Sequence, residues 1–330
     1  MPLYKGGAIA HCEGLRYITK NIQEIHPTFL LAVPAIFEAL HKAIWKGIKA
    51  KGKEKTVRKL IKVSNAAKKI GIDLTDVFFK EIKQTLGGKM RMMICGGAAI
   101  NPEILEDLQT FGIMALQGYG LSEALAAVTL CADEINKSGS VGIPIAGNYI
   151  KIIDPATRKS LPFGEVGEIV IHNNALMMGY LNDESETNDA LQMHDDGYVW
   201  LHTGDLGRMD EDGYIFYEGR QKRMIITSGY NVYPSHIESV IESHPAVLQC
   251  SVVGVPHPYK QEVPKAFIVL KEGYHGLFVK SEIKDYCKKN LAKYAVPYEF
   301  VYRKSLPKTK IGKVDFQKLK EDNDADDDEE

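Results

Sequence analysis

The sequence has few cysteines, and their spacing predicts neither a disulfide framework nor a zinc site. There are five in 330 residues, an odd number, and no two of them form a Cys-x-x-Cys pair. Disulfide-rich secreted domains and structural zinc sites both need such closely spaced cysteines. We therefore expect reduced thiols, most of them buried, in a cytosolic protein, at Cys12, Cys95, Cys131, Cys250 and Cys287.

Long apolar runs are also absent. No segment approaches the roughly 18 apolar residues that a membrane-spanning helix requires, and the N-terminus lacks the charged-then-apolar pattern of a signal peptide. These absences predict a cytoplasmic protein with at most peripheral membrane contact, for example to collect a lipid substrate. The lysine-rich stretch 42–69 predicts solvated helical surface, and the alternative is attraction to anionic lipid or to the phosphates of CoA.

A large excess of basic charge is the third absence. The formal net charge is -2, but the last ten residues, 321–330, carry eight acidic groups and predict a solvated, disordered tail. The rest of the chain then carries about +6, the difference between 41 basic and 35 acidic residues. This excess is too small and too scattered to indicate nucleic-acid binding.

What the sequence does contain is organised around the stretch Gln117-Gly118-Tyr119-Gly120-Leu121-Ser122-Glu123. It follows an apolar run, 113–116, that is short enough to be a buried strand. The glycines allow a sharp turn and a close approach to a ligand. The tyrosine offers a flat face, the serine a donor to phosphate, and the glutamate an oxygen for Mg²⁺. An ordinary strand-to-helix turn capped by Ser122 is the alternative.

The rest of the chain divides by texture into four predicted parts. Residues 1–137 alternate apolar strands with helices, including a strand that ends at Val33, a helix over 34–50 and a helix capped by Asn101. Residues 138–221 predict short antiparallel strands between turns, with Asp205 where a strand follows a turn. Residues 222–318 predict an α+β module whose second helix Ser281 caps, and 319–330 predict the acidic tail.

Further segments follow in a fixed order. They are Trp200-Leu-His-Thr-Gly-Asp205-Leu-Gly, Gly219-Arg-Gln-Lys-Arg-Met-Ile-Ile-Thr-Ser-Gly229-Tyr-Asn-Val-Tyr-Pro and Leu306-Pro-Lys-Thr-Lys-Ile-Gly-Lys313-Val-Asp. Together with the tyrosine-centred stretch, they resemble the adenylate-forming superfamily of acyl-CoA synthetases, adenylation domains and luciferases. The chain most resembles the C-terminal part of bacterial long-chain fatty-acid–CoA ligases, from about residue 2 to 318, with Ser122 where that family has threonine.

The resemblance implies a fold and a set of ligands. The fold would be a partial α/β subdomain, a small distorted antiparallel β-barrel and a mobile α+β C-terminal domain. The ligands would be fatty acid, ATP or AMP, Mg²⁺ and CoA. Tyr119 would stack on adenine while Gln117 or Gly118 binds its edge, with Gly120 beside them, and Gly97 and Ala98 would face the adenylate and the acyl carbonyl. Ser122 would contact the α-phosphate and Glu123 would hold Mg²⁺.

The remaining roles fall in the second half of the chain. Asp205 and Arg220 would fix the ribose, although Asp205 could be a plain turn residue and Arg220 a surface arginine paired with a glutamate. Lys313 would bridge carboxylate and phosphate oxygens, and the C-terminal domain would rotate about Lys222. Gly229, with Tyr230 beside it, would line the pantetheine tunnel. Arg223 stands where the family commonly has aspartate.

One family motif is missing from these residues. The Ser/Thr/Gly-rich loop ending in Pro-Lys-Gly, which cradles the β- and γ-phosphates of ATP in the family, does not occur. We therefore expect an N-terminally truncated ligase with weak or no activity alone, and an apolar, association-prone surface. The alternatives are one subunit of a split ligase with a separate N-terminal half, and a non-catalytic acyl- or nucleotide-binding remnant. A long-chain acid is the expected substrate, with a medium-chain or aryl acid as the next choice.

Overall fold

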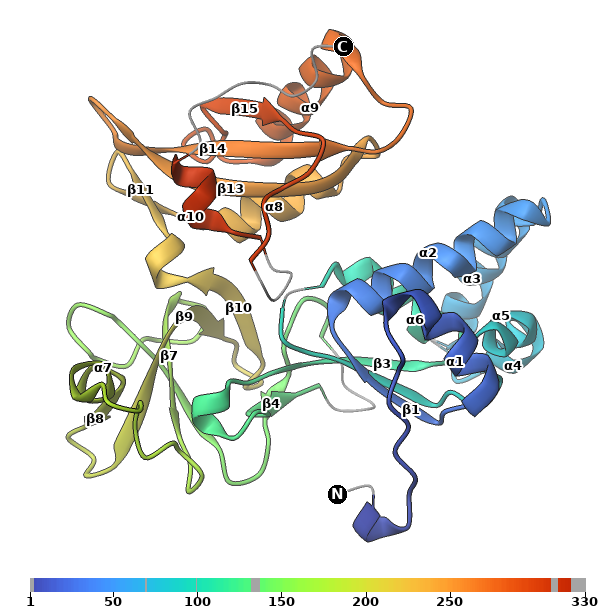
Figure 1. Ribbon diagram of the computed structural model, residues 1–330, viewed down its shortest axis with the longest axis horizontal. Coiled ribbons are helices and arrows are strands. Elements are labelled where there is room, and N and C mark those ends of the chain that lie inside the picture. The colour runs from blue at the N-terminus through green and yellow to red at the C-terminus, as the bar shows by residue number, and fades with distance from the viewer. Residues whose placement is uncertain (1–2, 69, 99, 132–136, 310–313, 322–330) are drawn as a thin grey trace. The chain divides into compact units, whose positions relative to one another are not determined.

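The computed structural model describes residues 3–68, 70–98, 100–131, 137–309 and 314–321 (Figure 1). The chain divides into two compact units. The first comprises Met1–Lys151, Val170–His202 and Met209–Phe216, and the second comprises Ile152–Ile169, Thr203–Arg208 and Tyr217–Glu330. The boundaries predicted from sequence texture stay predictions.

The elements of the first half of the chain are helices interleaved with short strands. In order they are η1 (Leu3–Lys5), η2 (Leu15–Tyr17), α1 (Ile18–Ile25), β1 (Phe29–Ala32), α2 (Pro34–Ala50), α3 (Glu54–Lys68), α4 (Thr75–Phe78), α5 (Lys80–Thr85), β2 (Met92–Cys95), α6 (Pro102–Thr110), β3 (Met114–Tyr119), η3 (Ser122–Ala124), β4 (Thr129–Leu130) and β5 (Ile143–Pro144).

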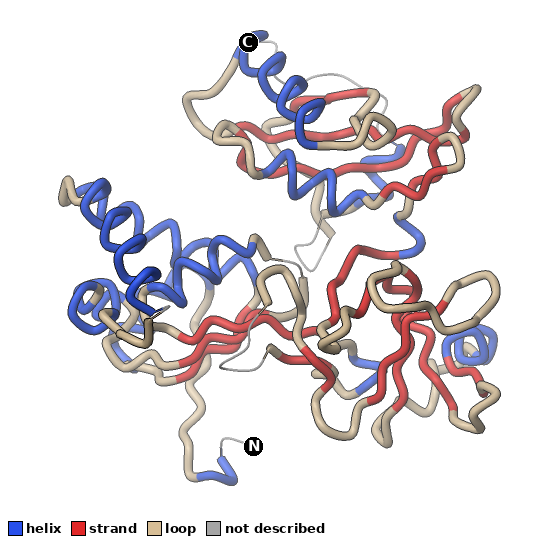
Figure 2. The backbone as a smooth tube through the Cα atoms, turned by 180° about the vertical axis from the view of Figure 1, so that it is seen from behind, coloured by secondary structure: helices blue, strands red, loops and turns tan. Residues whose placement is uncertain are grey.

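The first sheet has the order β1-β2-β3-β4-β5. Strands β1, β2 and β3 are parallel, with Phe29 opposite Met92 and Met92 opposite Met114, whereas β4 and β5 run antiparallel. Helices cover one face of the parallel part, as the two opposite views in Figures 1 and 2 show. The core between them is built mainly from α2, α5, α6, β2 and the segment 111–115.

Two helices in this region form where the sequence predicts them. Helix α2 begins with Pro34 at its first turn, where a missing backbone N–H costs nothing. It buries Phe37, Leu40, Ile44 and Ile48, while Ile36 is only partly buried. Helix α6 is capped by Asn101, whose side-chain oxygen accepts a hydrogen bond from the Glu103 N–H at 2.9 Å.

The second sheet is a curled antiparallel half-barrel. Its order is β10-β9-β7-β6, with β8 beside β9. The bounds are β6 (Tyr149–Ile153), β7 (Gly167–His172), α7 (Glu184–Ala190), β8 (Leu191–Met193), β9 (Val199–Met209) and β10 (Ile215–Arg220).

Strand β9 corrects the prediction that a turn comes directly before the strand at Asp205. The strand runs without interruption from Val199 to Met209, through Thr203, Gly204 and Asp205. Gly204 has φ 63°, a left-handed value that glycine adopts without a Cβ clash. The Gly-Asp pair therefore marks an irregular residue inside a long strand. A prediction from sequence assigns such a pair to a turn, because Gly and Asp are common where the chain reverses.

The C-terminal part forms the predicted α+β module. Its elements are η4 (Gln221–Arg223), β11 (Ile225–Thr227), β12 (Tyr230–Val232), α8 (Pro234–Glu242), β13 (Val247–His257), β14 (Gln261–Leu270), α9 (Gly276–Asn290), β15 (Glu299–Tyr302) and α10 (Phe316–Glu321). The sheet has the order β12-β11-β14-β13, and β15 pairs in parallel with β14.

Alternate residues of β13 and β14 supply two cores, one on each face of this sheet. Val252 and Ile268 belong to the core that α8 and α9 complete, and Val253 and Phe267 belong to the core that contains Leu319 of α10. Helix α10 thus includes the first residues of the predicted acidic tail, up to Glu321, and the rest of that tail lies outside the described residues.

The predicted start of α9 at Ser281 is wrong. The helix begins at Gly276, and its N-cap is His275, whose side chain makes no capping hydrogen bond. The sequence around Leu277 and Phe278, both largely exposed, lacks the capping pattern on which the prediction depended. The serine is instead an interior helical residue, where a capping side chain has no orphan N–H to accept from.

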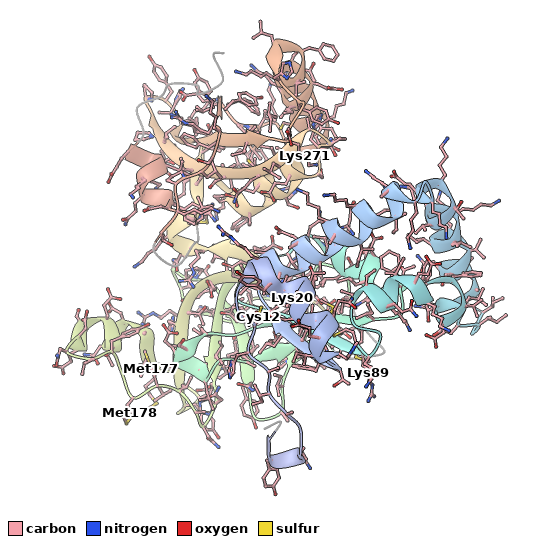
Figure 3. All side chains as sticks on the ribbon, turned by 45° about the vertical axis from the view of Figure 1, so that its right-hand side comes forward. Cys12, Lys20, Lys89, Met177, Met178 and Lys271 are labelled. Atoms are coloured by element: carbon pink, nitrogen blue, oxygen red, sulfur yellow. The ribbon has the colours of Figure 1, made fainter. Side chains whose placement is uncertain are left out.

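Two expectations from the absences can be compared with the structure. In the described part of the chain, none of the helices combines the length and apolar character needed to cross a membrane. The cysteines Cys95, Cys131, Cys250 and Cys287 are buried thiols, as predicted, whereas Cys12 is exposed and is labelled in Figure 3.

Strand β1 leaves apolar side chains on the face of the sheet that the helices do not cover. Leu31 is 69% exposed and Phe29 46%, whereas Leu30 packs against the helical core. Successive strand residues point to opposite faces, so two adjacent leucines have opposite environments. Whether this face belongs to the association-prone surface expected from the sequence stays a prediction.

A pair of substitutions tests this orientation. Leu30→Lys should lower the free energy of unfolding by about 3 kcal/mol, because it places an unpaired ammonium in the core. Leu31→Lys should change that free energy by no more than about 0.5 kcal/mol and should reduce self-association. Urea unfolding and analytical ultracentrifugation measure the two effects. Equal destabilisation by both lysines would contradict the assignment of faces.

Candidate active site

The carboxyl ends of β1, β2 and β3 meet at one edge of the first sheet, because the three strands are parallel. The N–H of Gly96, just after β2, donates to the carbonyl oxygen of Ala32 at the end of β1 (3.2 Å). Gly97 follows with φ 85°, and Ala98 beside it is exposed. Ligands of open α/β sheets bind at such an edge, and the contact of these small residues with an adenylate stays a prediction.

Strand β3 extends further into the predicted motif than its apolar run suggests. It ends at Tyr119, so Gln117 and Gly118 are strand residues, and Gln117 is buried. Tyr119 is partly exposed at the strand end, and its N–H donates to Thr129 Oγ1 at 3.3 Å. Its backbone is therefore held at the carboxyl edge of the sheet.

The motif glycines accommodate the protein's own backbone. A Cβ at Gly118 would lie 3.0 Å from the carbonyl oxygen of Thr129, and one at Gly120 only 1.4 Å from that of Ala126. Neither glycine has positive φ. The sequence analysis expects these glycines to permit a sharp turn and a ligand contact. The structure assigns them to close packing of the chain that returns after Glu123.

Ser122 and Glu123 form the 3-10 turn η3 directly after this strand. The hydroxyl of Tyr180 donates to Glu123 Oε1 at 3.0 Å, and the N–H of Met177 donates to the Glu123 carbonyl oxygen at 2.8 Å. Figure 3 labels Met177 and Met178 on this segment. The glutamate is thus fixed through both its backbone and its side chain, while Ser122 is exposed.

The residues around Glu123 fit a magnesium ion that takes most of its ligands from elsewhere. Mg²⁺ in nucleotide sites keeps several waters and uses one or two carboxylates together with substrate phosphates. The structure shows no cluster of three or more His, Cys, Asp or Glu side chains suited to a metal among the residues it describes. A single oriented carboxylate is consistent with a phosphate-bound ion and not with an all-protein metal cage.

Asp205 is a buried carboxylate in a defined polar network of the second unit. Its side chain is 3% exposed, and Arg220 Nε lies 2.9 Å from its Oδ1. The N–H of Asp205 donates to Thr203 Oγ1 (3.0 Å), and that of Gly204 donates to Glu168 Oε1 (2.9 Å). The structure thus brings Asp205 and Arg220, the two residues predicted to fix the ribose, into contact, and their role in ribose binding stays a prediction.

The charges of this network affect the pKa of the Tyr217 phenol in β10. Burial, together with the negative charge of Asp205, raises the pKa of the Tyr217 phenol to about 12, and Arg220 partly offsets the shift. The phenol therefore stays neutral well above physiological pH. A neutral hydroxyl beside Asp205 can donate a hydrogen bond without adding a second negative charge.

The predicted hinge residue lies in η4, a single 3-10 turn between β10 and β11. Lys222 is exposed, whereas its neighbour Arg223 is anchored. The Arg223 guanidinium donates to Glu238 Oε1 (2.6 Å) and to the Val252 carbonyl oxygen (3.2 Å), and it lies 3.6 Å from the centroid of the Phe316 ring. The residue that departs from the family pattern thus holds three elements of the C-terminal module together.

Gly229 occupies the second position of the two-residue turn that joins β11 and β12. Ser228 has φ 50° and Gly229 φ 82°, and Thr227 pairs with Tyr230 across the turn. Two left-handed residues in succession form the hairpin turn that favours glycine. The Tyr230 ring stacks on that of Tyr294, with centroids 4.5 Å apart. Lys313, the predicted catalytic lysine, lies outside the described residues.

The comparisons with known proteins identify the family. Residues 1–181 match the family of AMP-binding enzymes, and residues 236–313 match the C-terminal domain of AMP-binding enzymes. The chain is a member of the AMP-binding enzyme family. Its curated relatives include proteins named as CoA ligases, in agreement with the resemblance drawn from the motifs.

The curated relatives of this AMP-binding enzyme act on different acids, by their names. YdaB of Bacillus subtilis, named as an acyl–CoA ligase, is 39% identical over 235 residues, which cover 71% of this chain and 45% of YdaB. The long-chain-fatty-acid–CoA ligase of Bacillus subtilis is 37% identical over 237 residues, which cover 71% of this chain and 41% of that ligase. The 2-succinylbenzoate–CoA ligase of Bacillus cereus is 32% identical over 314 residues and covers 94% and 60%.

Solved structures agree with the fold. ATP-bound MatB of Rhodopseudomonas palustris is 27% identical with a TM-score of 0.73, covering 93% of this chain and 53% of MatB. MenE of Bacillus subtilis with its acyl-adenylate intermediate is 26% identical with a TM-score of 0.72, covering 94% and 54%. The chain thus spans 41% to 60% of the length of these relatives and structures.

Three residues of the site were missed by sequence reasoning. Tyr180 orients Glu123, Glu168 binds the N–H of Gly204, and the charge of Asp205 contributes to the raised pKa of Tyr217. The signal for Tyr180 was weak, because 57 residues separate it from Glu123. A buried glutamate in the strand β7 was the stronger signal, since an acidic side chain there needs a partner.

Replacing Tyr180 by phenylalanine tests whether it orients Glu123. The variant keeps the ring and loses the donor, so the Mg²⁺ concentration that half-saturates Mg²⁺-dependent ATP binding should rise by roughly tenfold. Isothermal titration calorimetry measures this dependence. Tyr198→Phe, an exposed tyrosine of the same unit, is the control, and an unchanged Mg²⁺ dependence in Tyr180→Phe would refute the assignment.

The pKa of Tyr217 predicts a loss of stability at alkaline pH. The unfolded phenol ionises near pH 10 and the folded one near 12, so the folded state retains a proton that the unfolded state releases. The free energy of unfolding should therefore fall as the pH rises from 10 to 12, by roughly 2 kcal/mol at most. Tyr217→Phe should flatten this slope in urea titrations, and Tyr259→Phe, at an exposed position, should not. Identical slopes in all three proteins would contradict the shift.

Proposed function

We propose that this AMP-binding enzyme joins a long-chain fatty acid to CoA through an acyl-adenylate. A carboxylate oxygen of the acid would attack the α-phosphorus of ATP, and the bond to the β-phosphate oxygen would break and release pyrophosphate. The CoA sulfur would then attack the acyl carbon and release AMP. The observation that supports this proposal is the paired arrangement of Asp205 with Arg220, together with Tyr119, Ser122 and Glu123 at one sheet edge.

The protein's part in this reaction would be positioning and charge stabilisation. Tyr119 would stack on adenine, with Gln117, Gly118 and Gly120 forming the strand end beside it. Gly97 and Ala98 would leave room for the adenylate and the acyl carbonyl. Ser122 would donate to the α-phosphate. These residues project from the carboxyl edge of one sheet, so a single rigid element would set their spacing.

The remaining residues would fix the sugar and the charges. A ribose hydroxyl would donate to Asp205, whose position Arg220 fixes from the other side. Bound Mg²⁺ would neutralise charge on the phosphates, and Glu123 would hold it. Lys313 would contact the reacting carboxylate and the ribose-phosphate oxygens during adenylation. Rotation about Lys222 would then withdraw Lys313 and present Gly229 and Tyr230 to the pantetheine arm of CoA.

The two half-reactions should differ in this chain. The residues that would hold the adenylate are present, whereas no Ser/Thr/Gly-rich loop ending in Pro-Lys-Gly occurs in the sequence. Pyrophosphate carries several negative charges that need donors as it leaves. We therefore expect weak or no adenylation from ATP by this chain alone, and more efficient thioester formation from preformed acyl-adenylate and CoA.

Two classes of acid are candidates for the substrate. Sequence identity favours one of them, and the share of the chain that is covered favours the other. The identity to the long-chain-fatty-acid–CoA ligase is 37%, against 32% for the 2-succinylbenzoate–CoA ligase, which covers more of this chain. We propose the long-chain acid on identity. An aryl or medium-chain acid is the second candidate, and competition between palmitate, octanoate and benzoate for thioester formation would rank them.

Lys313→Ala tests the mechanism. The variant lacks the ammonium that would stabilise the transferring groups, so adenylation should fall by about 100- to 1,000-fold. Thioester formation from preformed palmitoyl-adenylate should change little. Pyrophosphate release measures the first step and palmitoyl-CoA formation the second. Full wild-type adenylation would show that the missing phosphate loop is dispensable. Equal loss of both steps in Lys313→Ala would contradict the assigned role.

A substitution at Gly229 should affect the other step, so that thioester formation falls and adenylation is spared. Gly229→Leu should spare adenylation and lower thioester formation by on the order of 100-fold, because its side chain would obstruct the thiol. Gly229→Ala is the matched control, since alanine has the same conformational strain at φ 82° with little bulk. A Cβ at this position would have no neighbouring atom within 4 Å. An equal effect of alanine and leucine would point to strain in place of obstruction.

Activity that appears only with a second polypeptide would favour a split ligase. A folded chain that binds ATP and palmitate, and forms no thioester from palmitoyl-adenylate, would favour a non-catalytic binding module. The two rival functions are therefore resolved by the same preparations, with folding checked by circular dichroism.

A further inference from the structure

Two histidines of the β8–β9 hairpin face each other. His194 directly follows β8, and His202 lies in β9. The Nε2 atoms of the two imidazoles are 3.0 Å apart, and the ring centroids are 5.2 Å apart. Both rings are only partly buried, so ions in solution can reach them. Two metal-binding nitrogens thus point toward one small volume, and this pair has no part in the proposed reaction.

The hairpin holds these two side chains on one face. Gln192 pairs with Trp200 across the two strands, and the N–H of His194 donates to the carbonyl oxygen of Tyr198 at 3.0 Å. Since side chains alternate along a strand, both histidines lie on the same side of the hairpin as the Gln192–Trp200 pair. The His194 ring also stacks on the Trp200 ring, with centroids 5.7 Å apart and an interplanar angle of 25°. Strand pairing and this stacking therefore restrain the imidazole.

Gln192 adds an oxygen to the same face, two residues before His194. Its amide N–H donates to the carbonyl oxygen of Asp189 at 2.7 Å, whereas its Oε1 is buried and accepts no hydrogen bond within the described part of the chain. A buried acceptor without a donor is costly, and a cation would satisfy it. Asp196 in the adjoining turn is already paired with the Lys151 ammonium. Among the residues that the structure describes, no third His, Cys, Asp or Glu completes a metal-binding group.

The contact between the imidazoles has the chemistry and nearly the spacing of a metal site. As a hydrogen bond, it needs one neutral ring as donor and the other as acceptor. When the donor ring carries its proton on Nδ1 instead, both Nε2 lone pairs become ligands. Two Zn–N bonds of about 2.0 to 2.1 Å at a tetrahedral angle place their nitrogens about 3.3 Å apart. The observed 3.0 Å is close to this separation.

We propose that His194 and His202 bind a zinc ion that joins β8 to β9, with Gln192 Oε1 as a third ligand and water in the remaining position. Imidazole nitrogens suit Zn²⁺, Cu²⁺ and Ni²⁺, whereas Mg²⁺ prefers oxygen ligands. Strand β8 has three residues and pairs with β9 outside the main path of the sheet. The ion thus holds a strand that has few backbone hydrogen bonds of its own. This inference is independent of the proposed function.

Zinc titration of the metal-free full chain tests the site. The chain is treated with EDTA, desalted and titrated with Zn²⁺ by calorimetry at neutral pH in excess Mg²⁺. His194→Gln and His202→Gln should each raise the dissociation constant by about 10- to 100-fold, because loss of a ligand costs at least as much as loss of a group that orients one. Gln192→Leu should raise it by less, since an amide oxygen is the weaker zinc ligand.

The matched control is His275→Gln, at an exposed position of the other unit, where the side chain makes no capping hydrogen bond. This variant should bind zinc as the wild type does. Wild-type affinity in either hairpin histidine variant, or an equal loss in the control, would overturn the proposal.

Two further readouts separate loss of a ligand from loss of the fold. Zn²⁺ should raise the thermal midpoint of the wild type, because it binds the folded state, and should leave the midpoint of His194→Gln unchanged. Ni²⁺ at the site should quench the fluorescence of Trp200, which stacks on His194, and excess Zn²⁺ should reverse the quenching. Either effect at full size in His194→Gln would place the ion elsewhere and refute the site. Neither effect in the folded wild type would leave the pair as a hydrogen bond only.

Discussion

The close approach of two backbone segments at Gly120 is the constraint on which the candidate site depends. A Cβ at this position would lie 1.4 Å from the carbonyl oxygen of Ala126, so only glycine permits the chain to fold back there. Leu125 and Ala126 both have positive φ, which costs about 1 to 3 kcal/mol for each such residue. The N–H groups of Ala126 and Val128 bond to Leu121 and Tyr119, and these bonds hold the strained turn in place.

The returning segment determines where the functional side chains lie. Because the turn is locked against the end of β3, Tyr119, Ser122 and Glu123 come from one short, rigid piece of backbone. Tyr180 then fixes the carboxylate of Glu123 through a hydrogen bond of 3.0 Å. The positions of these side chains thus depend mainly on tight backbone packing and secondarily on side-chain contacts. Functional residues can therefore be held in place even where they are exposed.

Local signals explain which elements the sequence predicts correctly. Pro34 and Asn101 mark helix starts through backbone chemistry that acts over three or four residues. The Asp205 turn and the Ser281 cap failed because the decisive factors were not local. At Asp205, the pairing of β9 with neighbouring strands overrides the turn preference of Gly-Asp. At Ser281, the helix continues back to Gly276 without any side-chain cap, and of the added turn Val279 packs against the core.

The residues of the candidate site also divide into those that local motifs predict and those that they do not. Its ordered motifs could be found in the sequence, because each is a short run of residues with a recognisable composition. Tyr180, Glu168 and Tyr217 could not, because they act on Glu123, Gly204 and Asp205 across 57, 36 and 12 residues of chain, and only the folded structure makes them neighbours. A single sequence does not show which residues far apart in the chain become neighbours.

The rotation that we propose about Lys222 can be judged from the contacts that span this position. Arg223 binds Glu238, Val252 and Phe316, all of which follow the hinge, so rotation would leave these contacts intact. The hydroxyl of Ser235, by contrast, donates to the carbonyl oxygen of Glu218, before the hinge. A single hydrogen bond of this kind contributes about 1 kcal/mol, which thermal motion breaks readily. The Arg223 anchor therefore makes the C-terminal module rigid on its own side of the hinge, and the Ser235–Glu218 hydrogen bond is one contact that the rotation would break.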